Sequence, residues 1–206
     1  MTVRRRAGRG KYDRQTIDAI LDEGRFAHVG IVSDGQPFVI PMLYARDGNQ
    51  IYVHGSPLSR LVKTLVAGVP MCLTVTLLDG LVLARSAFHH SMNYRSVVIL
   101  GEGRVIQDRE HKLEALRMIV DHVVPGRSDD VRGPSDNELK ATEVISLGIQ
   151  EASAKIRTGP PVDDAEDYAL GAWAGELPLS LIAGAPVPDE RCAASIPDYV
   201  VSYGRS

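Results

Sequence analysis

The chain has few of the residues that cross-link or anchor a protein. Its 206 residues include two cysteines, Cys72 and Cys192. Two cysteines make neither a disulfide framework nor a zinc site, so we expect a reducing compartment and place the protein in the cytoplasm. No stretch approaches the roughly 20 apolar residues that a membrane-spanning helix needs. No apolar run follows the arginines near the N-terminus, as a secretory signal would require.

A large charge of one sign and the familiar nucleotide motifs are also missing. The formal net charge is −3, which argues against a general nucleic-acid-binding protein. The Walker A spacing and the GxSxG elbow of serine hydrolases are absent. The dinucleotide fingerprint GxGxxG is absent too, so a nicotinamide cofactor, NAD(P)H, is expected only as a transient electron donor.

What the sequence does contain is a series of short apolar runs separated by tight turns. Asp-Gly pairs, as at Asp34-Gly35, lie between apolar runs and predict hairpins. Asp79-Gly80 predicts another hairpin of this kind. Helices are expected at residues 13–23, 57–67 and 109–122, and strands at 26–33, 37–46, 50–54, 71–78, 81–87, 96–107 and 142–157, with a polar loop at 125–136 and Ser135 as a helix cap.

This order of elements favours a small antiparallel barrel over a parallel sheet, because short strands follow one another with few helices between them. An open α+β sheet is the alternative. We divide the chain into a basic arm (1–12), a barrel domain (13–180) and an extended C-terminal tail (181–206). The arm is either disordered or folds over a partner subunit or an anionic ligand.

The segment IYVHGSPLSRLVK (51–63) predicts a strand, a turn and a helix that together hold a phosphate. Ser56 is a suitable N-cap, and Arg60 and Lys63 lie on one side of the helix. The alternative is a solvated basic face. His54, one residue before the turn at Gly55, is either a hydrogen-bonded residue at a strand end or a neighbour of a bound cofactor.

A second polar cluster, RSAFHHSMNYRS, spans residues 85–96. Adjacent residues on extended backbone point to opposite sides, so His89 and His90 are not expected to share a metal ion. Arg95 and Ser96 open the next predicted strand, where they either contact an anionic ligand or belong to an ordinary polar loop. Trp173 either anchors the tail to the body or covers a flat aromatic cofactor.

Taken together, several segments resemble the pyridoxamine 5′-phosphate oxidase-like flavoproteins, in particular the group related to nitroimidazole-resistance reductases. The match runs in order over residues 9–180. The segments that carry it are RGKYD (9–13), AILDEG (19–24), HVGIVSDGQPFVIPMLYARDG (28–48), IYVHGSPLSRLVK (51–63), LTVTLLDGLVLARSAFHHSMNYRSVVILGEG (73–103), EASAKIRTGPP (151–161) and DYALGAWAGELPL (167–179).

This resemblance implies a mainly β fold, an antiparallel six-stranded split β-barrel with flanking helices. It also implies a homodimer with two FMN sites at the subunit interface. Trp173 would approach the flavin from the partner chain, and backbone groups at Pro41 and Met42, with Tyr94, would line the ring. The residues that would hold the phosphate are His54, Gly55, Ser56, Arg60 and Lys63, completed by Arg95 and Ser96.

The function expected from these residues is an FMN-dependent oxidoreductase acting on a small, planar organic substrate. His54 is the candidate proton donor, because an imidazole titrates near neutral pH. The C-terminal region reads WAGELP and lacks the arginine-rich motif of true pyridoxamine-phosphate oxidases, which argues against vitamin B6 oxidation. The alternatives are a non-catalytic flavin-binding or sensing protein, and the same fold with a deazaflavin or a haem. No metal ion, nucleic acid or membrane is expected as a partner.

Overall fold

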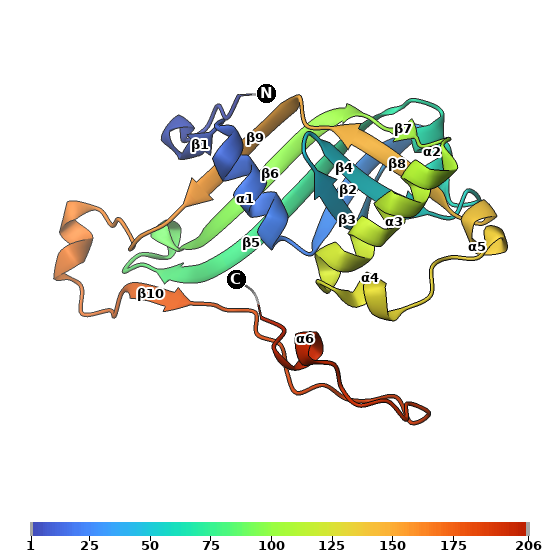
Figure 1. Ribbon diagram of the computed structural model, residues 1–206. Coiled ribbons are helices and arrows are strands. Elements are labelled where there is room, and N and C mark those ends of the chain that lie inside the picture. Colours follow the sequence, from blue (N-terminus) through green and yellow to red (C-terminus); the bar gives the residue numbers. More distant parts are fainter. Residues whose placement is uncertain (1, 205–206) are drawn as a thin grey trace.

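The computed structural model describes residues 2–204, which form a sheet of ten strands with helices packed around it (Figure 1). No helix among these residues is long and apolar enough to cross a membrane. The strands are β1 (Gly10–Lys11), β2 (Phe26–Ser33), β3 (Gln36–Asp47), β4 (Gln50–Gly55), β5 (Pro70–Leu83), β6 (Ser91–Glu102), β7 (Arg104–Val105), β8 (Glu143–Gly148), β9 (Glu151–Arg157) and β10 (Gly175–Pro178). The α-helices are α1 (Arg14–Glu23), α2 (Arg60–Val66), α3 (Arg109–Val123), α4 (Arg127–Asp130), α5 (Asp136–Lys140) and α6 (Asp198–Val201), with short 3₁₀ helices at Ala7–Arg9, Ala87–His89 and Ala165–Ala169.

The strands are antiparallel and follow the order β1-β9-β6-β5-β2-β3-β4-β8-β7, with β10 added beside β5. The long strand β3 connects the two halves of the sheet. Its first part pairs with β2 and its last part, Tyr44–Asp47, pairs with β4. The path is open and ends at β1 and β7, so the architecture is the predicted antiparallel split barrel, with ten strands in place of the expected six. The segment predicted as one strand at 142–157 forms β8 and β9, which pair with different strands.

The predicted hairpin at Asp79-Gly80 is wrong, because β5 runs through this dipeptide as one strand. Both halves of β5 pair with β6, and the register shifts between Leu78 and Gly80, as at a β-bulge. A Cβ at Gly80 would lie 3.0 Å from the carbonyl oxygen of Leu177 in β10. Glycine at this position therefore allows the close approach of β10 rather than a chain reversal.

Alternate residues of the long strands fill the core. In β2, Ala27, Val29 and Ile31 are buried, as the period of two predicts. The helix α1, capped by Asp13, adds Ile17, Ile20 and Leu21 to the same cluster. A smaller apolar cluster lies beneath α3 and contains Ala45, Tyr52, Ile106, Ala115, Ile119 and Val144.

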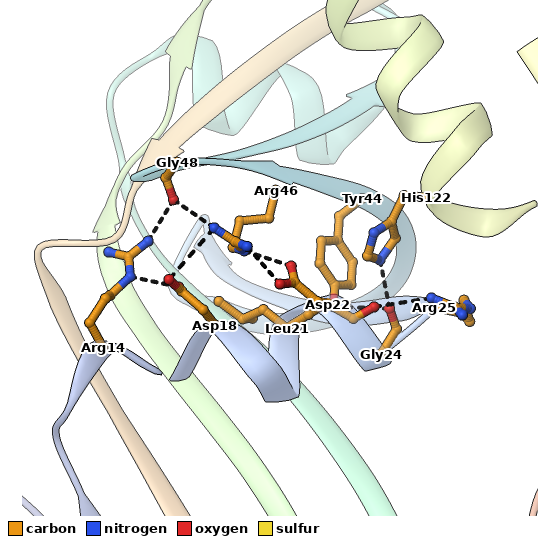
Figure 2. Close-up of polar contacts among 10 residues, drawn as sticks. All are labelled: Arg14, Asp18, Leu21, Asp22, Gly24, Arg25, Tyr44, Arg46, Gly48 and His122. Atoms are coloured by element: carbon orange, nitrogen blue, oxygen red, sulfur yellow. Dashed lines mark hydrogen bonds and ion pairs between the residues drawn. The ribbon is translucent and has the colours of Figure 1, made fainter. Parts of the chain in front are cut away.

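A buried tyrosine connects α1, β3 and α3 (Figure 2). The Tyr44 hydroxyl donates a hydrogen bond of 2.5 Å to the carbonyl oxygen of Leu21. Next to this tyrosine, Nε2 of His122 lies 2.6 Å from the carbonyl oxygen of Gly24, and the two rings are 4.7 Å apart between centroids. Burial raises the pKa of Tyr44. These contacts satisfy carbonyl groups at the C-terminal end of α1 that the helix itself leaves without partners.

Beside this tyrosine, an arginine fork holds α1 to the hairpin between β3 and β4 (Figure 2). Nε and Nη2 of Arg46 donate to the two carboxylate oxygens of Asp22, at 2.7 and 2.6 Å. Arg14 donates to Asp18 and to the carbonyl oxygen of Gly48. The paired geometry fixes α1 against the end of β3.

The helix α2 starts later than predicted. Ser59, not Ser56, is its N-cap and accepts a hydrogen bond from the backbone N–H of Val62 at 3.2 Å. Residues 56–59 form a turn instead, closed by the bond from the Ser59 N–H to the Ser56 carbonyl. Proline at the second position favours such a turn. Leu58 therefore leaves the predicted core stripe, and its side chain is 79% exposed.

The C-terminal segment runs along the outside of the sheet and then away from it (Figure 1). It contributes β10, and the stretch between β10 and α6 has no helix or strand. The polar loop predicted at 125–136 contains α4, and Ser135 caps α5 as predicted, in a complete capping box with Glu138. Tyr203 donates to the carbonyl oxygen of Val123 at 2.9 Å, which fastens the end of the tail to α3.

Candidate functional site

A cleft of about 420 Å³ lies where β3, β4 and the turn before α2 meet. We call it the turn cleft. It brings together six of the residues predicted to contact a cofactor: Pro41, Met42, His54, Gly55, Ser56 and Arg60. The turn of residues 56–59 places two hydroxyl groups, of Ser56 and Ser59, in its wall.

Arg60 supplies the positive charge of the turn cleft. Its guanidinium carbon lies 4.2 Å from the ring centroid of Phe38, a cation–π contact that holds the side chain against β3. No carboxylate pairs with Arg60 among residues 2–204. The predicted partner Lys63 is exposed on α2 and lies outside the cleft wall. The turn cleft therefore offers one cation and two hydroxyl groups to an anionic ligand.

A second and larger cleft, of about 710 Å³, adjoins the first and runs beneath α3 and α4. We call it the α3 cleft. Leu43 and His54 line both clefts. Most of its wall is aliphatic, from Leu113, Leu116, Ile119, Val120, Val123, Val124 and Val131, while Arg117, Arg127 and Arg132 add cations. An apolar cavity of this size with a few polar groups is typical of a small-molecule or cofactor site.

His54 lies at the boundary between the two clefts. It follows the buried residues Ile51, Tyr52 and Val53 at the end of β4, and its backbone pairs with Val144 of β8. Its Nδ1 atom is buried and has no hydrogen-bond partner. Burial lowers the pKa of His54, so the imidazole is neutral near neutral pH. A neutral imidazole suits a metal ligand or a proton acceptor better than the predicted proton donor.

The residues predicted at the start of a later strand lie elsewhere. Tyr94, Arg95 and Ser96 are inside β6, which begins at Ser91, and none of them lines either cleft. Nε and Nη2 of Arg95 donate to Asp79, at 3.0 and 2.8 Å, and Nη1 and Nη2 donate to Glu23. These bonds engage four of the five guanidinium N–H groups and raise the pKa of Arg95.

Trp173 also lies apart from both clefts. Its side chain is 69% exposed just before β10, where its ring lies close to Gly175. A group that could bind a metal ion, His89 with Asp164 and Asp167, occurs among residues 2–204. Nε2 of His89 lies 3.2 Å from Asp164, whose carboxylate is largely exposed, so an ordinary surface hydrogen bond accounts for this group.

The α3 cleft is the part of the site that sequence reasoning missed. Leu113, Leu116 and Val120 follow the spacing of any amphipathic helix, and this spacing predicts core packing rather than a cavity wall. The cavity forms because α4 and residues 131–134 lie opposite α3. That arrangement depends on contacts between distant segments, so the sequence carries no separate signal for it.

Comparisons with known proteins agree with this architecture. The family model described as pyridoxamine 5′-phosphate oxidase matches residues 13–156. The flavocytochrome Anf3 from Azotobacter vinelandii is 44% identical, with a TM-score of 0.93 over 99% of this chain and 96% of the other. The FAD and heme binding protein from Mycobacterium smegmatis is 35% identical, with a TM-score of 0.90 over 96% and 98% of the two chains.

A more distant structure is the putative 5-nitroimidazole antibiotic resistance protein from Bacteroides thetaiotaomicron. It is 26% identical, with a TM-score of 0.61 over 71% of this chain and 86% of the other. No protein with a curated description matches the sequence. The family model covers more than half of the chain, and two solved structures above 30% identity cover nearly all of it. The chain therefore belongs to the pyridoxamine 5′-phosphate oxidase-like family.

Proposed function

We propose that this protein binds a flavin and a haem and transfers electrons between them. The main structural support is the pair of adjoining clefts that share His54. Its similarity to a flavocytochrome and to an FAD and heme binding protein, over nearly the full length of each, supports the same pair of cofactors. Haem was an alternative at the sequence level, and the α3 cleft now favours it.

The residues of the α3 cleft fit a haem. The cleft is large and mostly aliphatic, as the porphyrin ring requires, and His54 is one of the residues that line it. Histidine is a common axial ligand of haem iron. The propionate groups would be bound by three arginines of the cleft, Arg117, Arg127 and Arg132. Each of these arginines also bonds to a protein group, as Arg132 does to Glu138. His54 would thus hold the iron while the helix α3 covers the ring.

The turn cleft fits the flavin phosphate. Arg60 and the hydroxyl groups of Ser56 and Ser59 would bind it, while Pro41 and Met42 would contact the ring system. FAD is the expected form, in place of the FMN predicted from the sequence, because the Mycobacterium smegmatis relative is described as binding FAD. When bound, a flavin exchanges two electrons with organic donors and haem exchanges one, so the pair suits stepwise electron transfer.

A homodimer is part of the proposal. Apolar side chains of the C-terminal tail are exposed in the single chain, and burial against a second copy would remove them from water. Trp173, Tyr94 and Ser96, which do not reach the clefts of their own chain, would then be available to the partner's site. The exposed tail residues include Trp173, Leu177, Leu181, Ile182 and Val187.

The test is the absorption spectrum of the purified protein, with mass spectrometry of the released ligands and light scattering for its mass. We expect flavin bands, a haem Soret band, FAD as the released flavin and a dimeric mass. A protein that contains flavin alone and does not bind added haem would overturn the haem assignment. Anaerobic reduction by NAD(P)H, followed by an acceptor screen, tests the enzymatic role; failure with every donor and acceptor would favour a binding or sensing protein.

A further inference from the structure

A third cavity, of about 660 Å³, lies at the other end of the sheet from the turn cleft and shares no residue with either cleft. We call it the arm cavity, because the N-terminal arm forms one side of it. Its other walls come from β9, from residues 88–91 and from residues 162–164. Its charged lining residues are Arg5, Arg6, Arg9, Lys155, Arg157, Asp163 and Asp164, and its two histidines are His89 and His90.

The arm is docked on the sheet by backbone contacts. Gly10 and Lys11 form β1, which pairs with Lys155 and Ala154 of β9. The N–H of Val3 donates a hydrogen bond of 2.9 Å to the Tyr12 hydroxyl, which folds the start of the arm back toward β1. These contacts carry three arginines to a part of β9 that already bears two cations. The arm therefore creates a concentration of like charge that the sheet by itself would not have.

Arg157 is the central cation of the arm cavity. It is only 7% exposed, yet no carboxylate contacts its guanidinium among residues 2–204. Nη1 donates to the side chain of Asn93 and to the carbonyl oxygen of Gly159, and Nη2 donates to the carbonyl oxygen of Pro160. Nε is buried without a partner. Burial, and then the charge of Arg9, lower the pKa of Arg157.

The other charged residues of the arm cavity do not neutralise the charge of Arg157. The side chains of Arg5, Arg6, Arg9 and Lys155 make no hydrogen bond or ion pair with any residue from 2 to 204. The two aspartates are already used. Asp163 accepts from the N–H and from Nη1 of Arg85, both at 3.0 Å, and Asp164 pairs with His89. Five cations thus line one cavity, while one of its two carboxylates is held by Arg85 and the other lies against His89.

We propose that the arm cavity binds a small ligand through a phosphate or pyrophosphate group. Charges of like sign in a partly buried space destabilise one another, and a bound anion would offset that cost. Arginine forks match phosphate oxygens, so Arg9 can donate more than one hydrogen bond to the group, while Arg157 adds its charge and the remaining N–H of Nη2. The site is independent of the proposed flavin and haem, since none of its residues lines their clefts. It also gives the N-terminal arm a role, as a flap over an anion.

Isothermal titration calorimetry of the purified full chain, at low salt, tests the proposal. The probes are inorganic phosphate, pyrophosphate and NADP⁺, which separate a free oxyanion from a phosphorylated organic ligand. At least one probe should bind, and Arg9→Glu should weaken that binding by about tenfold or more, because it removes a charged hydrogen-bond donor and adds a repelling carboxylate. Arg4→Glu, the same change on the same arm but outside the cavity wall, should alter it less than about twofold.

Three results would overturn the proposal. One is that none of the probes binds, and another is that Arg9→Glu and Arg4→Glu weaken binding equally, which would indicate only a diffuse charge effect. The third is that Arg9→Glu releases the flavin, since the cavity would then belong to the flavin site. Cofactor absorbance and urea unfolding, recorded on each variant, show that the chain is folded and loaded. Arg157→Lys, which keeps the charge but loses the fork, should reduce binding in the same direction.

Discussion

The guanidinium of Arg95 in β6 and the carboxylate of Asp79 in β5 are joined by two hydrogen bonds, of 3.0 and 2.8 Å. The same guanidinium also donates to Glu23 at the end of α1. Arg95 therefore connects α1 to the bulge in β5 within a single chain. Its N–H groups are engaged, which counts against the predicted contact with a flavin phosphate.

Replacing this arginine should affect stability more than cofactor binding. Arg95→Met leaves two partly buried carboxylates without their partner, and we expect a loss of about 1–3 kcal/mol in the free energy of unfolding. Urea unfolding measures this loss. Arg104→Met, at an exposed position on β7, is the control and should change stability by less than about 0.5 kcal/mol. Unchanged stability together with loss of flavin would restore Arg95 as a phosphate ligand.

Two cations one helical turn apart should differ in their effect on the flavin. Arg60 lines the turn cleft and Lys63 does not. Arg60→Glu should lower flavin affinity by about tenfold or more, because it replaces a phosphate donor with a repelling charge. Lys63→Glu introduces the same change in charge on α2 and should lower it much less. Fluorescence titration of the flavin-free protein with FAD compares the two, and equal effects would show that the phosphate lies elsewhere.

His54 should be required for the haem but not for the fold. His54→Ala removes a half-buried imidazole whose Nδ1 has no protein partner, so no protein hydrogen bond at that atom is lost. We expect the Soret band to decrease strongly or to shift, while flavin content falls less. Absorbance spectra with added haem measure both. His122→Ala is a comparison at a second buried histidine, and a spectrum altered equally by both variants would argue against His54 as the ligand.

Stability should fall as the solution becomes mildly acidic. Burial lowers the pKa values of His54 and His122, so near pH 6.5 the unfolded chain takes up protons more readily than the folded one. Their contribution to the free energy of unfolding is therefore intact above about pH 6.5 and decreases as the pH falls below that value. His122→Gln should make this decrease shallower. Urea unfolding at several pH values, with His90→Gln as an exposed control, measures the slope; identical slopes for His122→Gln and the wild type would contradict the assignment.

The sequence pattern predicted helices and strands correctly where residues close together in the chain determine the structure. Strand β2 has the predicted bounds, because its buried residues alternate and the turn that follows is specific. Asp34 and Gly35 have φ values of 52° and 74°, which a two-residue hairpin turn requires. The same reasoning failed at Asp79-Gly80. There β6 pairs with both halves of the strand, and these long-range hydrogen bonds outweigh the preference of the dipeptide for a turn.

The residues predicted for the candidate site also fall into two groups, those that the local pattern placed correctly and those that it did not. Six predicted residues meet in the turn cleft, since they come from neighbouring strands and from the turn that follows. The other residues predicted to contact the cofactor lie outside the turn cleft: Lys63, Tyr94, Arg95, Ser96 and Trp173. The helical and strand periods are equally compatible with a phosphate contact for Lys63 and for Arg95. They contain no information on the carboxylate of Glu23, which is far away in the sequence and bonds to Arg95.

By itself, the sequence determined the antiparallel split barrel, the family, and the strand, turn and helix that form the turn cleft. These follow from alternation, turn residues and motifs, all of which act over a few neighbouring positions. Only the tertiary structure decided that Arg95 pairs with two carboxylates, that α3 covers an apolar cleft, and that the N-terminal arm brings its arginines to Arg157. Each of these depends on groups far apart in the chain, and the way the whole sheet folds and packs decides whether they meet.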